Sequence, residues 1–253
     1  MYKRGRCKGS GECVKSCPKD AISKSGQYVS VNRELCDLCG KCSSVCPTGA
    51  LVVIGKTMTA DEILREIEKD VAFYDESGGG VTFSGGEPLM QPDFLDALLE
   101  ACKKRNIHTA LDTCGFAPWK TVDRIKGKVD LFLYDLKTVE DREHRKHTRG
   151  SNRLILENFE RLAKNGSKIS VRFPVIPGVN DDAKNVTKMG KFVLSHGVKQ
   201  VCLLPYQRAG IEKYRSLDRA YELEGVQSPS DERMQQIKEK LIKLGLDVRI
   251  GGG

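Results

Sequence analysis

The sequence lacks the features that would place the chain in a membrane or outside the cell. It has no apolar run near the roughly 18 residues that a membrane-spanning helix needs. Its first seven residues, MYKRGRC, contain no apolar core of a secretory signal peptide. Hydrophobic residues make up 39% and charged residues 30% of the chain, which is typical of a soluble globular protein. We therefore expect a cytoplasmic protein without a membrane partner.

The sequence also lacks a basic arm of the kind that binds nucleic acids. The 253 residues carry a formal net charge of +8, but Lys and Arg are spread along the whole chain. A basic balance alone identifies no partner. We therefore expect no nucleic-acid partner.

Cysteine, in contrast, is abundant and unevenly distributed. Seven of the ten cysteines fall between Cys7 and Cys46. The chain is too long, and its cysteines are too clustered, for the disulfide framework of a small secreted protein. In a reducing compartment, clustered cysteines are metal ligands more often than disulfide partners. The first part of the chain is therefore predicted to bind metal.

These cysteines belong to an internal repeat with an offset of 29 residues. The second copy reads C-x2-C-x2-C-x3-C-P, the bacterial ferredoxin pattern for a [4Fe–4S] cluster. The repeat therefore predicts a ferredoxin-like α+β domain with two iron–sulfur clusters over residues 1–55. The matched positions are Cys7, Ser10, Cys13, Cys17 and Pro18 in the first copy, and Cys36, Cys39, Cys42, Cys46 and Pro47 in the second.

The ferredoxin pattern assigns the ligands, because the cysteine before each proline reaches the cluster of the other copy. The complete site is predicted to consist of Cys17, Cys36, Cys39 and Cys42. The incomplete site is predicted to consist of Cys7, Cys13, Cys46 and Ser10. A serine hydroxyl is a harder and less acidic donor than a thiol. This site is therefore expected to hold a [3Fe–4S] cluster, or a cubane with a serine, water or external ligand. For the whole cysteine array, the alternative to iron–sulfur clusters is zinc, because C-x2-C also suits a tetrahedral zinc site.

The rest of the chain, residues 56–253, alternates between helical and strand patterns. Thr59 and Glu62 form a capping-box pattern at the start of a helix over residues 59–74. Alternating strands and helices indicate βαβ units and a parallel sheet. The fold class is therefore α/β, with an open partial (β/α) barrel. The predicted strands are 81–84, 108–113, 129–136, 169–176, 200–205 and 247–250, and the further helices are 92–104, 118–125, 152–165, 182–196 and 230–244.

Polar and glycine-rich residues follow several of these strands. Functional groups of parallel βα folds collect at the carboxyl ends of the strands. We therefore expect a binding site at this edge of the sheet. Its candidate residues are Gly85, Gly86, Glu87, Asp112, Thr113, Asp135, Lys137, Arg172 and Gln207.

The ordered set of motifs resembles the glycyl-radical enzyme activating enzymes, a branch of the radical S-adenosylmethionine (SAM) superfamily that is similar to pyruvate formate-lyase activating enzyme. Members with an inserted two-cluster ferredoxin domain are the most similar, and the resemblance covers nearly the whole chain. It rests on VTFSGGEPLMQ at 81–91, LDTCG at 111–115, YDLK at 134–137, HRKHTRGSN at 144–152, VRFPVIPGVND at 171–181 and LLPY at 203–206.

The resemblance implies an anaerobic oxidoreductase that cleaves SAM reductively and takes a hydrogen from a glycine of a partner glycyl-radical enzyme. The clusters of residues 1–55 would relay electrons from flavodoxin or ferredoxin, and the protein would be a monomer. Gly85, Gly86 and Glu87 would bind the SAM amino group through open backbone and a carboxylate. The other implied contacts are Asp135, Lys137 and Arg172 near the methionyl part of SAM, Gln207 at the nucleoside, and Asp112 and Thr113 at a monovalent cation.

Structural interpretations compete with these roles. Gly85 and Gly86 suit a tight turn, Lys137 suits a solvated loop charge, and Arg172 suits a structural ion pair. The charged run over residues 140–149 suits a solvated helix face better than a metal site, although it contains His144 and His147. The remaining cysteines are expected in a helix core (Cys102), in a strand core (Cys202) and near the proposed site (Cys114).

The sequence departs from the family pattern at two places. Gln207 stands where a histidine is common. The C-x3-C-x2-C loop of the catalytic cluster is absent, because Asp20 and Gly49 stand at the third positions of the two C-x3-C spacings. We therefore expect a barrel over 56–253 without its first strand and catalytic loop, in an N-terminally truncated chain that is inactive by itself. The alternatives are an electron-transfer protein with a passive barrel and a radical SAM enzyme acting on a small molecule.

Overall fold

The computed structural model describes residues 1–251. The chain divides into two compact units. The first, here called the cysteine unit, consists of Met1–Thr57 and Gln207–Gly225, and the second, the sheet unit, consists of Met58–Tyr206 and Val226–Gly253. The sequence pattern assigns residues 207–225 to the barrel, whereas in the structure they belong to the cysteine unit.

Hydrogen bonds explain why this late segment joins the N-terminal residues. The backbone N–H of Tyr2 donates to the carbonyl of Ser216 over 2.9 Å. The Arg4 guanidinium forms an ion pair with Asp218 over 2.8 Å. The elements of the cysteine unit are η1 (Arg4–Arg6), α1 (Glu12–Lys15), β1 (Ile22–Ser25), β2 (Tyr28–Val31), α2 (Lys41–Ser44) and α10 (Ala209–Ser216).

The sequence repeat of the cysteine unit is also a structural repeat. In the antiparallel hairpin of β1 and β2, Ile22 pairs with Val31. A shift of 29 residues relates this pair to Leu51 and Tyr2, which form an antiparallel bridge of their own. The helices α1 and α2 are related by the same shift. Each copy therefore contributes one helix and one strand pairing to a shared core.

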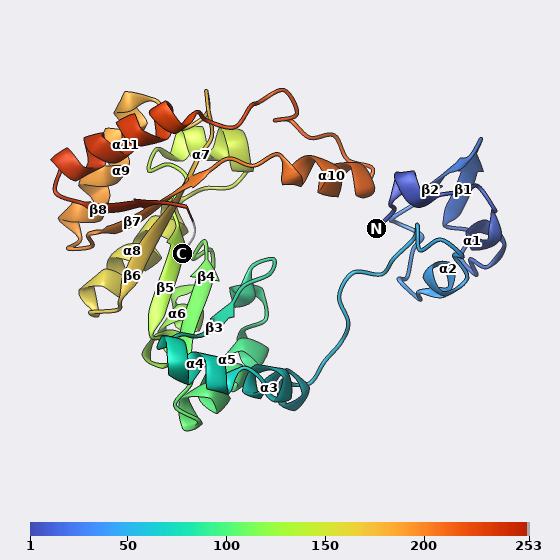
Figure 1. The fold of residues 1–253 in the computed structure, drawn as a ribbon, viewed down its shortest axis with the longest axis horizontal. Helices are drawn as coiled ribbons and strands as arrows, with labels where there is room; N and C mark the ends of the chain where they lie inside the picture. The colour runs from blue at the N-terminus through green and yellow to red at the C-terminus, as the bar shows by residue number, and fades with distance from the viewer. Residues whose placement is uncertain (252–253) are drawn as a thin grey trace. The chain divides into compact units, whose positions relative to one another are not determined.

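The sheet unit is built on one six-stranded parallel sheet, as the alternating pattern predicts. Its strands lie in the order in which they occur in the sequence, β3-β4-β5-β6-β7-β8 (Figure 1). Three of the six strands begin and end where the sequence analysis places them. The strands are β3 (Gly80–Phe83), β4 (His108–Thr113), β5 (Leu131–Asp135), β6 (Ile169–Val175), β7 (Gln200–Pro205) and β8 (Asp247–Ile250).

Helices connect successive strands, as βαβ units require. The predicted helix over 59–74 is wrong in its extent. Its capping box at Thr59 and Glu62 forms, but a second helix starts after Asp70, whose carbonyl accepts from the N–H groups of Phe73 and Tyr74. The helices are α3 (Ala60–Glu68), α4 (Val71–Ser77), η2 (Pro88–Met90), α5 (Pro92–Lys104), α6 (Trp119–Ile125), η3 (Lys126–Lys128), α7 (Asp141–Thr148), α8 (Arg153–Lys164), α9 (Ala183–Ser195) and α11 (Asp231–Lys243).

The two faces of the sheet differ in burial. Alternate residues along a strand point to opposite faces, and one face carries Phe132, Tyr134 and Phe173, each at most 1% exposed. These side chains form the main core with residues of the helices. The half-buried side chains of Asp135 and Arg172 lie on the opposite face and are directly paired across β5 and β6. This second face is the one that positions the candidate site.

Among residues 1–251, no helix is both long enough and apolar enough to cross a membrane.

Candidate functional site

The four cysteines assigned to the complete cluster line one cavity of the cysteine unit. The cavity has a volume of about 270 Å³. Its walls include the apolar side chains of Ile22, Val31 and Leu51. The four cysteines that line it are Cys17, Cys36, Cys39 and Cys42. The donor chemistry fits a cubane cluster, because four thiols from both copies of the repeat surround one space.

The residues assigned to the incomplete cluster line a second cavity of the same unit. This cavity is smaller, with a volume of about 20 Å³, and the buried side chains of Tyr2, Val29 and Leu51 form part of its wall. The predicted ligands among its lining residues are Cys7, Ser10, Cys13 and Cys46. Its donor set therefore contains three sulfur atoms and one oxygen atom.

Backbone donors reach equivalent sulfur atoms in the two copies. The Ala21 N–H donates to the Cys17 Sγ over 3.3 Å, and the Ala50 N–H donates to the Cys46 Sγ over 3.2 Å. Burial raises the pKa of the Cys46 thiol, but backbone N–H groups, with Leu51 foremost, outweigh burial and lower this pKa to about 7. These donors favour the thiolate, the form that binds iron.

Within residues 1–251, no three His, Cys, Asp or Glu side chains lie close enough together to hold a single metal ion.

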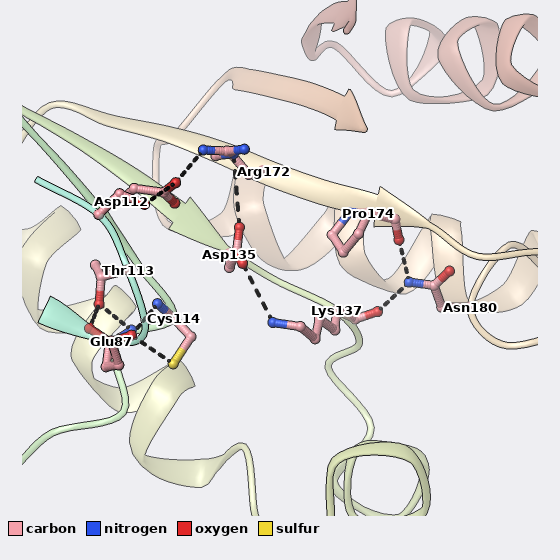
Figure 2. Close-up of polar contacts among 11 residues, drawn as sticks. Glu87, Asp112, Thr113, Cys114, Asp135, Lys137, Arg172, Pro174 and Asn180 are labelled. Carbon is pink, nitrogen blue, oxygen red and sulfur yellow. Dashed lines mark hydrogen bonds and ion pairs between the residues drawn. The ribbon is translucent and has the colours of Figure 1, made fainter. Parts of the chain in front are cut away.

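The sheet unit gathers alternating charges at the carboxyl ends of three neighbouring strands (Figure 2). The Arg172 guanidinium lies 2.5 Å from Asp112 and 4.0 Å from Asp135. The Lys137 ammonium lies 3.5 Å from the other oxygen of Asp135. Burial raises the pKa of Asp135, the Lys137 charge opposes this shift, and the neighbouring Asp112 adds to it. The arrangement offers two cations and two carboxylates to a zwitterionic ligand.

Glu87 has a different role from the one that the motif suggests. Its carboxylate accepts hydrogen bonds from the Thr113 hydroxyl (2.6 Å), and from the backbone N–H (2.9 Å) and thiol (3.0 Å) of Cys114. It also accepts from the Leu89 N–H over 3.1 Å. Four protein donors therefore engage the carboxylate that we expected to pair with a ligand ammonium. Glu87 joins the loop after β3 to the loop after β4, as Figure 2 shows.

The Cys114 thiol is a neutral donor in this contact. Burial and the Glu87 carboxylate raise its pKa to about 11. The thiol therefore keeps its proton near neutral pH and holds the D-T-C-G loop against Glu87.

The backbone of Gly85 and Gly86 is open to a ligand. A Cβ atom built on either glycine would meet no heavy atom within 4 Å. Gly85 has a φ of +131°, which side chains rarely adopt. Peptide groups of this turn therefore remain accessible beside the charged residues.

Gly115 allows the loop after β4 to lie against the core. A Cβ atom on Gly115 would lie 1.8 Å from the Tyr134 hydroxyl, so no larger residue fits there without movement. The buried Asn158 amide donates to the carbonyls of Gly115 and Ala117, each over 2.8 Å. The hydrogen bonds from Asn158 therefore hold the loop that follows Thr113 against the core.

Asn180 is a site residue that sequence reasoning did not single out. Its buried amide donates to the carbonyls of Lys137 (3.0 Å) and Pro174 (2.7 Å) and accepts from the Ile176 N–H (2.8 Å). It therefore ties the end of β6 to the loop that carries Lys137 (Figure 2). The only sequence signal was its place in the V-I-P-G-V-N-D motif.

None of the contacts described above involves Gln207, His144, Cys102 or Cys202. Gln207 is exposed and is the first residue of the segment that belongs to the cysteine unit. His144 is buried and bonded to the Gly150 carbonyl over 2.7 Å, so the prediction of a solvated face is wrong for this residue. Cys102 is fully buried in α5, as expected. Cys202 is only half-buried in β7.

Comparisons with known proteins agree with this geometry. The Radical SAM superfamily profile matches residues 38–189, and the 4Fe-4S dicluster domain profile matches residues 6–50. The trans-4-hydroxy-L-proline dehydratase activating enzyme of Clostridioides difficile is 38% identical over 255 residues, covering 100% of this chain and 84% of that protein. The isethionate sulfite-lyase activating enzyme of Nitratidesulfovibrio vulgaris is 41% identical over 225 residues, covering 86% and 73%.

A solved structure supports the fold of the sheet unit. The crystal structure of a domain of pyruvate-formate lyase-activating enzyme from Bacteroides vulgatus has a TM-score of 0.59 and 36% sequence identity. The match covers 69% of this chain and 99% of that domain. Fold and site together define a parallel α/β protein with a dicluster ferredoxin-type unit. The chain belongs to the radical SAM superfamily and, within it, to the activating enzymes of glycyl-radical enzymes.

Proposed function

We propose that the chain activates a glycyl-radical enzyme by using SAM bound at the carboxyl edge of β3 to β6. The observation that carries this proposal is the charged group of Asp112, Asp135, Lys137 and Arg172 beside the open Gly85-Gly86 turn. SAM supplies the 5′-deoxyadenosyl radical when it is bound and reductively cleaved. The partner supplies the glycine whose hydrogen atom is removed.

Different residues at the carboxyl edge of the sheet are proposed to bind different parts of SAM. Because protein donors engage the Glu87 carboxylate, the backbone of Gly85 and Gly86 is left to bind the SAM amino group. Lys137 and Arg172 suit the methionyl carboxylate and the ribose hydroxyls, because a guanidinium or ammonium donates several hydrogen bonds. Gln207 is proposed to contact the nucleoside.

Asp135, like Lys137 and Arg172, is proposed to lie near the methionyl part of SAM. Asp112 and Thr113 are proposed to hold a monovalent cation beside the cofactor. Asp112 and Thr113 are adjacent at the carboxyl end of β4, so their oxygen atoms follow the same strand. SAM affinity should then rise with K⁺ or Na⁺ relative to a large organic cation.

The cysteine unit is proposed to relay electrons. The cavity of Cys17, Cys36, Cys39 and Cys42 suits a [4Fe–4S] cluster. The cavity with Ser10 suits a [3Fe–4S] cluster, because an oxygen atom replaces one thiol. We propose flavodoxin or ferredoxin as the donor, a cytoplasmic location and a monomeric state.

The activity test measures 5′-deoxyadenosine and the glycyl-radical signal of a candidate partner enzyme. Reductive cleavage requires a C-x3-C-x2-C loop, a spacing that residues 1–253 do not contain. The assay therefore uses the chain with a C-x3-C-x2-C segment joined ahead of Met1. We expect 5′-deoxyadenosine under anaerobic, reducing conditions. Its absence from the reduced, cluster-loaded protein would contradict the proposal.

A binding variant makes the test specific to the edge residues. Arg172→Lys keeps the charge but loses the planar fork, so we expect SAM affinity to fall about tenfold. Lys164→Ala is the matched control, because Lys164 pairs with Glu160 on the exposed side of α8. Equal affinities of all three proteins would place SAM elsewhere.

An electron-transfer protein with a passive barrel is the second candidate. The absence of the C-x3-C-x2-C spacing from residues 1–253 favours it. It predicts reversible cluster reduction that SAM leaves unchanged.

A further inference from the structure

The cavity of the complete cluster site has an exposed apolar rim. Leu38 and Ile54 line this cavity and are 67% and 65% exposed, and Val53 beside them is 47% exposed. Large apolar side chains gain free energy when they leave water. A rim of three such side chains around one cavity is therefore a surface that a partner can cover.

Leu38 is also held in an unfavourable backbone conformation. Its φ is +59°, a region that disfavours residues with a Cβ atom. The equivalent residue of the first copy is Gly9, with a φ of +72°. Glycine adopts this positive φ without strain in the first copy, whereas the second copy has an exposed leucine at the same position. Because both copies share this backbone conformation, the feature that needs a reason is the exposed leucine, and an exposed apolar residue indicates a role outside the fold.

The cavity lined by Cys7, Ser10, Cys13 and Cys46 has no such apolar rim. None of the exposed large apolar side chains of residues 1–251 lines it. Its large apolar side chains, Tyr2, Val29 and Leu51, are all buried, and the exposed Pro47 also lines it. The apolar rim therefore marks the site of Cys17, Cys36, Cys39 and Cys42 and not cysteine cavities in general.

Positive charge surrounds the apolar rim. Lys19, Arg33 and Lys213 line the same cavity, and all three are exposed. None of them has a salt-bridge partner among residues 1–251. Asp37 is the one carboxylate among the lining residues. The whole N-terminal segment shares this bias, because residues 1–57 contain ten Lys and Arg against four Asp and Glu.

We propose that this surface, the Leu38 patch (Leu38, Val53, Ile54, Lys19, Arg33 and Lys213), docks an acidic one-electron carrier protein. The carrier's acidic rim would face the three cations, and its apolar centre would cover Leu38 and Ile54. One electron would then pass from the reduced carrier to the cluster of Cys17, Cys36, Cys39 and Cys42, with no bond made or broken. The proposal rests on the relay function above and names the cluster at which electrons enter.

The test measures binding of a purified flavodoxin to the cluster-loaded chain by anaerobic calorimetry. Leu38→Gly removes the apolar contact and places at this position the residue of the first copy. Binding is compared between parent and variant preparations with equal iron and sulfide content. We expect the dissociation constant to rise about tenfold. The double variant Lys19→Glu, Arg33→Glu should weaken binding further, and most at low salt.

Lys15→Glu is the matched charge control. Lys15 is exposed in the same unit and pairs with Glu12, but it does not line the cavity. We expect flavodoxin to bind this variant like the parent. Stopped-flow reduction by flavodoxin should slow in the patch variants, whereas reduction by dithionite should not change.

Three results would overturn the proposal. They are equal affinity of the Leu38→Gly variant and the parent, an equal effect of Lys15→Glu, or a loss confined to binding of the glycyl-radical enzyme. The last result would assign the patch to that enzyme. A parent protein without iron and sulfide would instead contradict the relay function itself, so the two failures are distinguishable.

Discussion

At the scale of single residues, the predicted donor sets of the two cysteine cavities differ in one atom. Ser10 and Cys39 hold equivalent positions of the repeat, and both are exposed. A hydroxyl oxygen binds iron less well than a thiolate, so a cluster at the second site is expected to hold fewer iron atoms. This asymmetry stays a prediction from the repeat, which aligns every other proposed ligand with a cysteine.

Replacing Ser10 with cysteine tests the assignment. We expect the Ser10→Cys variant to lose the electron paramagnetic resonance signal of an oxidised [3Fe–4S] cluster and to gain a reducible [4Fe–4S] cluster. Ser44→Cys is the control, because Ser44 lies in the same unit but lines neither cavity. A Ser10→Cys spectrum identical to that of the parent would mean that the ligand register of the first copy is wrong.

Glu87 illustrates a role that no pattern could reveal. The G-G-E motif suggested a ligand contact, but the carboxylate binds Thr113 and Cys114, residues that follow a different strand. Sequence spacing does not state which side chains meet across neighbouring strands.

The Glu87→Gln variant should be less stable than the parent. Its amide replaces one acceptor oxygen with a donor that faces other donors, which leaves polar groups unpaired. We expect the free energy of unfolding to fall by about 1–3 kcal/mol. Urea unfolding followed by the fluorescence of Trp119, the one tryptophan, measures this loss in the sheet unit.

The control is Glu76→Gln, on the exposed surface of α4, which should leave the unfolding free energy within about 0.5 kcal/mol of the parent. A loss of equal size in both variants would show that the Glu87 contacts do not hold the loops.

At the scale of elements, periodicity predicted most of the sheet unit. β4, β7 and β8 begin and end as expected: β7 contains the apolar run 201–204, β4 has apolar residues at its centre, and β8 alternates charged and apolar residues. The helix over 59–74 was wrong because apolar residues keep helical spacing across Asp70, where the backbone turns. The helix α10 was missed because its sequence has few apolar residues and its packing partner lies some 200 residues away.

Asn180 connects β6 to the loop after β5. Replacing it tests whether this connection supports SAM binding as well as folding stability. In Asn180→Ala, the carbonyls of Lys137 and Pro174 lose their donor. We expect unfolding to become easier by about 1–3 kcal/mol and SAM to bind more weakly, because the Lys137 loop is no longer fixed. Asn165→Ala, at the exposed end of α8, is the control. Unchanged SAM affinity in Asn180→Ala would restrict Asn180 to a structural role.

At the scale of the whole molecule, the sequence predicted both folding units but not their composition. Local cysteine spacing identified the ferredoxin-type repeat, and the alternation of elements predicted the parallel sheet. Contacts between residues far apart in the sequence, such as Arg4 with Asp218, carry no local signal. The charged edge of the sheet was predicted from strand ends, whereas its ion pairs and the Glu87 contacts required the structure.

Metal and sulfide analysis of the anaerobically purified chain tests the central claim, that two unlike iron–sulfur sites lie in the cysteine unit. We predict about seven to eight iron atoms per chain with a matching amount of acid-labile sulfide and no zinc. A stoichiometric amount of zinc without sulfide would contradict the account.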